Sequence, residues 1–290
     1  MGRWDLLERV SAQIAARDPT RVEAQFSRAE ALVRLGRLDD AVQAIDAVLA
    51  MQPKSYDGLE LRREAVKALK RWPDVAATSL RILELQPQNA RALKDLALSR
   101  MQTGQAPLAI RGYDAVLAIS SDDLEAWRGK RDVLREGPDP RTLLKVCDEI
   151  LERDHGDATT WRVKGTAHEA LDQSQDALTA YENALRLNSK DLEACRRRAA
   201  YLFKLDRLPD ALRSYQTAVE LAPSSEALWY EMARVLLRMK RPEDALGACD
   251  RATMLNSSDP HAWSERGLAL VAMQRYEEAV SSYDRALDLD

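Results

Sequence analysis

The sequence predicts an all-α protein in which tandem helix–turn–helix units stack into a solenoid. The first observation is a 34-residue period that runs from residue 22 to residue 290 without insertion or deletion. The second is that each period holds two stretches whose apolar residues recur three to four positions apart, the spacing of one helix face. The third is composition, because 11 Gly and 11 Pro among 290 residues favour helices over a turn-rich β protein.

Tryptophan positions define the register of the period. Trp127, Trp161, Trp229 and Trp263 are separated by one or two periods. We therefore divide the chain into eight rows and number the positions within each row as columns 1 to 34. The rows begin at residues 22, 56, 90, 124, 158, 192, 226 and 260, so the predicted array covers residues 22–290. Columns 20 and 27 are apolar in all eight rows, so one register holds throughout.

Each row is expected to contain a first helix, a short break and a second helix. Residues 1–21 precede the first row, and residues 4–18 align there with the second helix of an incomplete row. In the full rows, the break falls on pairs such as Gly36-Arg37 and Gly104-Gln105, which suit a tight turn between helices. A proline such as Pro223 follows the second helix in several rows and ends it.

The fourth row departs most from the pattern. Residues Gly137-Pro138-Asp139-Pro140 replace the end of its first helix and the turn. Two prolines two residues apart cannot lie inside a helix, so we expect the first helix of this row to end near Glu136. The segment is either a tolerated tight turn or a hinge in the solenoid.

Small residues at column 8 indicate close packing between the two helices of a row. The column is Ala or Gly except at Arg63 and Arg131, and we expect it to face column 20 of the second helix. One helix pair cannot bury both of its faces, so neighbouring rows must stack. The stability of such an array is a sum of row terms and interface terms.

The last row, residues 262–287 (AWSERGLALVAMQRYEEAVSSYDRAL), resembles a tetratricopeptide repeat (TPR). The family pattern is large–small–large on the first helix and Ala–aromatic–Ala on the second. The matching residues are Trp263, Gly267, Leu270, Ala279, Tyr283 and Ala286. The resemblance extends over residues 22–290. It implies a right-handed superhelix of helix pairs, whose first helices line a concave groove that binds other proteins.

The groove implied by the resemblance carries the candidate binding residues. Column 5 places a cation in four consecutive rows: Lys94, Arg128, Arg162 and Arg196. The other candidates are Glu169, Phe203, Lys204, Tyr230, Arg234 and Arg238. Planar donors beside aromatic rings suit an extended acidic peptide or a C-terminal carboxylate. The alternative is a solvated helix face, on which carboxylates pair with these cations; the candidates are Glu125, Asp132, Glu169 and Glu193.

Two binding devices of the family are missing from the pattern. The carboxylate clamp that holds chaperone tails needs asparagines beside its lysines, and column 9 contains no Asn. The asparagine ladder of TPR glycosyltransferases is also missing, because column 6 contains no Asn either. We therefore expect neither a chaperone-tail adaptor nor that kind of glycosyltransferase array.

No constellation for catalysis, a cofactor or a metal stands out. The three histidines lack ligand spacing, and there is no phosphate-binding or nucleophile motif. Cys147, Cys195 and Cys249 form no CxxC, which suits reduced thiols and a cytoplasmic location. With 43 basic against 47 acidic residues, nothing favours nucleic acid as a partner. No apolar run approaches the length of a membrane span, so membrane insertion is not expected.

The sequence thus predicts a non-catalytic scaffold or adaptor that binds an extended peptide segment of a partner in its groove. One alternative is a regulatory or substrate-recruiting segment of a larger multidomain enzyme. Another is an architectural solenoid that self-associates through uncapped ends, because apolar residues such as Val280 and Leu287 would face a following helix.

Overall fold

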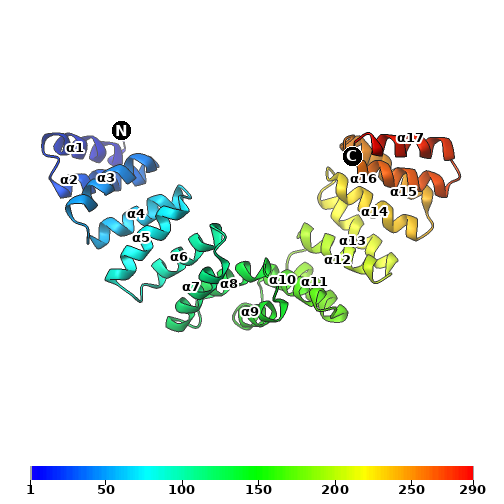
Figure 1. Cartoon of the computed structure of the whole chain (residues 1–290), viewed down its shortest axis with the longest axis horizontal. Helices are drawn as coiled ribbons and strands as arrows, with labels where there is room; N and C mark the ends of the chain where they lie inside the picture. The colour runs from blue at the N-terminus through cyan, green and yellow to red at the C-terminus, as the bar shows by residue number, and fades with distance from the viewer. Residues whose placement is uncertain (1, 290) are drawn as a thin grey trace. The chain divides into compact units, whose positions relative to one another are not determined.

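Helices form about four-fifths of the chain in the computed structural model, which describes residues 2–289. Those residues contain 17 α-helices and no strand, which confirms the predicted all-α class (Figure 1). The chain divides into two compact units, residues 1–142 and 143–290, which we describe separately.

The first unit is a stack of helices in which each packs on the next. Its helices are α1 (Arg3–Arg17), α2 (Val22–Arg34), α3 (Leu38–Met51), α4 (Tyr56–Ala68), α5 (Trp72–Leu85), α6 (Ala90–Gln102), α7 (Ala106–Ile119) and α8 (Leu124–Arg135). The even-numbered helices begin at the residues that open the predicted rows. A core of alanine and branched aliphatic side chains, including Ile45, Leu59 and Ile82, lies between the pairs.

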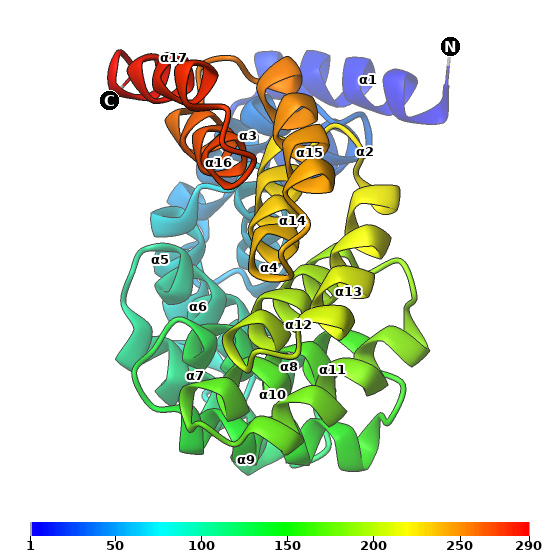
Figure 2. The same cartoon turned by 90° about the vertical axis from the view of Figure 1, so that its right-hand side faces the viewer.

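The second unit repeats the arrangement. It follows from α9 (Pro140–Arg153), which begins three residues before the unit boundary. The further helices are α10 (Ala158–Ala170), α11 (Ser174–Leu187), α12 (Leu192–Lys204), α13 (Leu208–Leu221), α14 (Glu226–Arg238), α15 (Pro242–Leu255), α16 (Pro260–Ala272) and α17 (Tyr276–Leu287). Each helix from α10 to α17 packs on its neighbour in the chain (Figure 2). Both units are therefore solenoids of tandem helix pairs.

In seven of the eight rows, the turn inside the row depends on one residue with left-handed backbone at column 15. Gly36 and Gly104 have φ of +75° and +74° there, and Lys70 and Lys240 have φ of +54° and +56°. In the first row, the Arg37 N–H donates to the Leu32 carbonyl at 2.9 Å. This is the Schellman ending, in which a left-handed residue lets the chain turn back and satisfy the last carbonyls of the helix.

Row four lacks this turn because Pro138 stands at column 15. The proline ring holds φ near −65°, so the left-handed conformation is closed to it. Helix α8 ends at Arg135, as the two prolines predicted, and α9 begins at Pro140. The boundary between the two compact units, after Thr142, follows within a few residues. The chain is thus divided where the turn of the repeat cannot form.

Tryptophan at column 4 closes the loop between rows. The indole N–H donates to a backbone carbonyl six residues earlier in four rows: Trp127 to Ser121 (2.8 Å), Trp161 to His155 (3.2 Å), Trp229 to Pro223 (3.0 Å) and Trp263 to Ser257 (2.9 Å). The ring therefore fixes the entry into each first helix as well as filling space, which explains why Trp marks the period.

Neighbouring rows are joined by an ion pair that the sequence analysis did not predict. A cation at column 7 of a first helix pairs with a carboxylate at column 25 of the preceding second helix. The pairs are Arg62–Asp46 (2.7 Å), Lys130–Asp114 (2.6 Å), Lys164–Asp148 (2.6 Å), Arg198–Glu182 (3.3 Å) and Arg266–Asp250 (2.7 Å). We call this contact the inter-row pair. The three arginines also donate to a hydroxyl of their own row, as Arg266 does to Ser282 at 2.7 Å.

Column 8 holds small residues because an aromatic ring of the second helix packs against it, as in rows five and eight. A Cβ added at Gly165 or Gly267 would lie 2.7 or 2.6 Å from the ring of Tyr181 or Tyr283, so only glycine lets the ring lie there. Arg63, which occupies column 8 in row two, is accommodated by ion pairs. Its side chain is 1% exposed, and it pairs with Glu60 at 2.6 Å and with Asp95 at 3.0 Å. A buried charge of this kind is tolerated only when it is paired.

Candidate binding site

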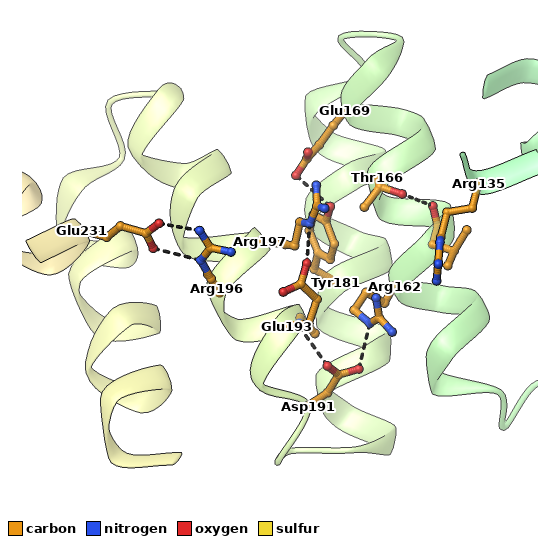
Figure 3. Close-up of polar contacts among 12 residues, drawn as sticks. Arg135, Arg162, Thr166, Glu169, Tyr181, Asp191, Glu193, Arg196, Arg197 and Glu231 are labelled. Carbon is orange, nitrogen blue, oxygen red and sulfur yellow. Dashed lines mark hydrogen bonds and ion pairs between the residues drawn. The ribbon is translucent and has the colours of Figure 1, made fainter. Parts of the chain in front are cut away.

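The predicted column-5 cations lie on the first helices, and Lys94, Arg162 and Arg196 pair with acids on the following first helix or at its N-cap. The Nζ of Lys94 lies 3.0 Å from the Asp123 carboxylate and 2.5 Å from that of Glu125. Arg162 donates to Asp191 at 3.1 Å (Figure 3). Arg196 holds Glu231 with two hydrogen bonds, of 3.1 and 2.7 Å. These cations therefore serve first to connect neighbouring rows.

The sequence pattern suggested four carboxylates as alternative partners of the column-5 cations. Only one of them pairs as expected in the contacts described below. Glu125 does pair with Lys94, as that alternative expects. Asp132 instead accepts from its neighbour Arg131, and Glu193 accepts from Arg197 at 2.8 Å. Glu169 accepts from the Tyr181 hydroxyl at 2.8 Å. The paired acids of Arg162 and Arg196 were missed, because they lie at an N-cap and at column 6.

The protein environment favours the charged form of Lys94 but disfavours the charged form of Glu169. Burial alone would lower the pKa of Lys94, but hydrogen bonds to Glu125 and Asp123 outweigh it and raise that pKa. The amine is therefore firmly charged. Burial raises the pKa of Glu169, and the hydrogen bond from Tyr181 offsets this only in part. The cation is stabilised by its site, whereas the carboxylate is destabilised in its ionised form.

In the first unit, a pocket of about 210 Å³ brings Lys94 and Arg128 together. Its wall comes from the facing first helices α6 and α8, with a few groups from their neighbours. The lining residues are Lys67, Lys94, Asp95, Leu98, Met101, Tyr113, Glu125, Arg128, Gly129 and Asp132. A Cβ at Gly129 would lie 2.3 Å from the Tyr113 ring, so the glycine lets this ring form part of the wall. The pocket combines cations with the apolar side chains of Leu98 and Met101.

A second pocket of the first unit was not predicted. It has a volume of about 290 Å³ and lies on α2 and α4, the first helices of rows one and two. Its lining is mostly acidic and apolar: Phe26, Glu30, Val33, Arg34, Asp57, Glu60, Leu61, Glu64 and Arg91. The signal was present in the sequence, since column 9 reads Glu30 and Glu64 in these two rows.

In the second unit, the structure gathers three predicted residues around one ring. The guanidinium carbons of Arg234 and Arg238 lie 5.5 and 5.6 Å from the Phe203 ring centroid. Both arginines stay more than half exposed while pairing with Glu265 at 3.4 Å and Asp206 at 2.7 Å, respectively. Phe203, Arg234 and Arg238 form a surface that we call the Phe203 cluster. Cations held over an aromatic face are stabilised without losing access to solvent.

The two remaining candidates lie apart from the Phe203 ring. Lys204 pairs with Asp172 at 3.4 Å and lies 5.7 Å from the Tyr201 ring centroid. The Tyr230 ring lies 6.2 Å from that of His261. Both are at least partly exposed, so they border the surface of the first helices.

Within residues 2–289, no group of three or more His, Cys, Asp or Glu side chains is placed to hold a metal ion. None of the helices in that range combines the length and the apolar character that crossing a membrane requires.

Three family models match the chain, and each describes a tetratricopeptide repeat. One matches residues 7–56 and 162–226, the second residues 202–266 and the third residues 260–290. A curated protein from Schizosaccharomyces pombe, named DnaJ homolog subfamily C member 7 homolog, is 28% identical over 203 residues. The alignment covers 64% of this chain, and the chain spans 42% of that relative's length.

Solved structures share the fold at low sequence identity. A tetratricopeptide repeat protein from Parabacteroides merdae aligns with a TM-score of 0.62 at 14% identity, over 81% of this chain and 93% of that one. YrrB, described as a TPR protein with an unusual peptide-binding site, aligns with a TM-score of 0.55 at 21% identity, over 69% of this chain and 99% of that one. At these identities the likeness concerns the fold alone.

Proposed function

The chain belongs to the tetratricopeptide repeat family, and from this premise we propose that it is a non-catalytic scaffold that binds an extended segment of another protein. The proposed binding surface is formed by the first helices. The partner segment that we propose carries acidic side chains next to aliphatic ones.

The observation that carries the proposal is the 210 Å³ pocket between α6 and α8. Leu98 and Met101 offer apolar surface there, and Lys94 and Arg128 offer positive charge beside it. A carboxylate that reaches these cations gains charge-assisted hydrogen bonds, while an adjacent aliphatic side chain covers the apolar wall. Such a mixed pocket favours a peptide over a small anion.

The acids in this pocket differ in how firmly they are held. Asp95 is 4% exposed and is paired with the buried Arg63. By contrast, the side chain of Glu125 is 72% exposed, although it pairs with Lys94. Because Glu125 itself is exposed, its pair with Lys94 is worth on the order of 1 kcal/mol, so an incoming carboxylate can displace Glu125 at modest cost. Glu125 therefore competes with the partner's carboxylate for Lys94 and can be replaced by it.

Other predicted residues take different roles in this proposal. Arg162 and Arg196 hold neighbouring rows together through Asp191 and Glu231. The Phe203 cluster provides a second contact surface in the other unit, because its arginines are half exposed and offer planar donors. We also propose a reducing compartment such as the cytoplasm, since all three cysteines are buried as reduced thiols.

The test is selection of peptides from a displayed random library on the immobilised chain, followed by calorimetric titration of one selected peptide. Selected peptides are expected to contain Asp or Glu next to Leu, Ile or Met. Lys94→Glu is expected to weaken binding about tenfold or more, since it replaces attraction by repulsion. Glu125→Ala is expected to strengthen binding about two- to fivefold, because the peptide carboxylate no longer competes with Glu125 for Lys94. This factor corresponds to the free energy of the lost ion pair.

A matched control is Lys145→Glu, the same charge reversal at an exposed lysine outside the pocket. It should leave the affinity within about twofold of the parent chain, as expected for a remote surface charge. The proposal fails if the Lys94 and Lys145 variants lose the same affinity, or if the selected peptides carry no acidic residue.

A further inference from the structure

The run of tryptophans at column 4 is interrupted inside the second unit. Rows four, five, seven and eight have Trp at this column, whereas row six has Cys195. The Cys195 side chain is directed into the structure, since the residue is only 2% exposed. Because a thiol fills much less space than an indole, the exchange leaves room beside it.

A pocket of about 310 Å³ lies at this position, and we call it the Cys195 pocket. Its wall is formed by α11, α12, α13 and the loop between α11 and α12. The lining includes Leu185, Ser189, Cys195, Arg198 and Thr217. The volume is at the lower end of the range for small-molecule pockets, about 300–1,000 Å³, so it suits a single ring system.

The corresponding pocket of row five shows how an indole changes this place. It has a volume of about 390 Å³ and, like the Cys195 pocket, is formed by columns 4, 7, 19, 22, 23 and 26 of its own row. Trp161 is part of its wall, and on the preceding row it touches columns 21 and 25. The Cys195 pocket instead reaches columns 28 and 32 of the preceding row, at Leu185 and Ser189. It therefore extends toward the loop that the indole contacts in other rows.

The hydrogen-bond acceptor for an indole is still present in row six. In the four rows with Trp, the indole N–H donates to the backbone carbonyl at column 32 of the preceding row, at 2.8–3.2 Å. The equivalent carbonyl here belongs to Ser189. It accepts no hydrogen bond from the protein within residues 2–289. Row six thus keeps the acceptor and lacks the donor.

The cation that accompanies the ring is present as well. At column 7, three cations lie over the indole of their own row: Lys130 at 5.6 Å from the ring centroid, Lys164 at 5.3 Å and Arg266 at 5.8 Å. Arg198 holds this column in row six and lines the pocket. Its guanidinium bonds to Ser214 at 3.0 Å and to Glu182 at 3.3 Å, but its buried Nε has no hydrogen-bond partner among the described residues. An aromatic face placed here would meet both the charge and this N–H group.

From these observations we propose that the Cys195 pocket binds the indole ring of a ligand. The ring N–H donates to the Ser189 carbonyl, one face lies against the Arg198 guanidinium, and the ring edge covers Leu185. The ring belongs to a small indole compound or to a tryptophan side chain of a partner segment, and its chemistry in the pocket is the same. No residue of the pocket between α6 and α8 takes part, so this proposal stands or falls independently of the proposed peptide binding.

The first probe is indole itself, added to the full chain and followed by ligand-observed NMR. Saturable binding is expected, with a dissociation constant of about 1 mM or lower, as for a single well-placed ring. Benzofuran has the same shape and lacks the N–H group, so it is expected to bind about three- to tenfold more weakly. Equal affinities would contradict the hydrogen bond to Ser189.

Substitutions test the pocket itself. Cys195→Trp places the indole of the other rows in the pocket and is expected to abolish binding, whereas Cys195→Ala leaves the pocket open and should keep the affinity nearly unchanged. Arg198→Gln is expected to weaken binding about threefold or more, because the cation over the ring is lost. Arg266→Gln is the matched control, since it makes the same change at the same column of row eight, where Trp263 occupies column 4.

The source of the ring is tested with a capped Gly-Trp-Gly peptide. Tighter binding of the peptide than of indole assigns the ring to a partner segment, and the reverse order assigns it to a small molecule; either order supports the pocket. The proposal is overturned if indole shows no saturable binding up to its solubility limit, or if the folded Cys195→Trp chain binds indole as well as the parent chain does. Circular dichroism establishes that this variant is folded, and the benzofuran and Arg198 comparisons do not depend on it.

Discussion

Two glycine-to-alanine substitutions are expected to change stability in opposite directions. Gly104 has φ of +74°, and a Cβ added there meets nothing within 4 Å. The cost of Gly104→Ala is therefore purely conformational. Left-handed backbone costs an L residue roughly 1–2 kcal/mol. Alanine recovers about 0.4–1 kcal/mol of this by restricting the unfolded chain. The net loss is about 1 kcal/mol.

Gly247 provides the matched substitution. It lies inside α15, and a Cβ there also meets nothing within 4 Å. Because its backbone is helical, Gly247→Ala is expected to stabilise the chain by about 0.8–1 kcal/mol, the difference in helix propensity. Neither substitution changes packing, so the two differ only in backbone conformation.

Urea unfolding followed by circular dichroism at 222 nm measures both variants against the parent chain. We expect the transition of the Gly104 variant at lower urea and that of the Gly247 variant at higher urea. Shifts of the same sign would refute the assignment of the left-handed turn as the source of the effect. Lys240→Gly extends the comparison and should stabilise, since it relieves φ of +56° at a lysine.

Two further predictions concern buried and half-buried charges. Arg63→Met should destabilise by about 2 kcal/mol in urea unfolding, because the buried Asp95 loses the buried one of its two cations and keeps only Lys67, at 2.5 Å. Asp95→Leu added to it should restore part of the loss, since it removes the carboxylate, and a double variant as unstable as the single one would contradict this. Burial raises the pKa of Glu169 in the folded state, so its ionised form destabilises at pH 7 and the penalty vanishes as the carboxyl is protonated at lower pH. Glu169→Gln, which keeps an acceptor for Tyr181, should therefore raise the urea midpoint at pH 7 and not below about pH 4, and an equal gain at both pH values would count against it.

The fold was predictable because the period is strict. Once column 20 and the Trp column fix the register, the start of every first helix follows, and Val22, Tyr56 and Ala90 open α2, α4 and α6 as the rows require. The conformation of Lys70 and Lys240 was not predictable from residue type. A left-handed lysine is unfavourable alone, and only the hydrogen bonds of the turn make it acceptable.

The arrangement of the candidate residues was only partly predictable. The columns correctly indicate which residues lie on the first helices, and the structure brings Lys94 and Arg128 to one pocket. Ion pairing was harder, because the partner of a cation lies about one row further along the chain. Asp191 precedes its helix as an N-cap, and Glu231 lies at column 6, so neither is among the carboxylates that the sequence analysis names as partners of these cations.

The inter-row pair also determines which rows can be neighbours. Where column 7 is apolar, as at Leu96 and Met232, column 25 of the preceding row is uncharged, at Leu80 and Gln216. Between the eight full rows, charged columns thus meet charged ones and uncharged columns meet uncharged ones. The rows are therefore not all interchangeable modules: exchanging rows three and four, for example, would leave Asp148 facing Leu96. These contacts restrict which rows can be neighbours, which limits how such an array can grow by duplication or be shortened by deletion.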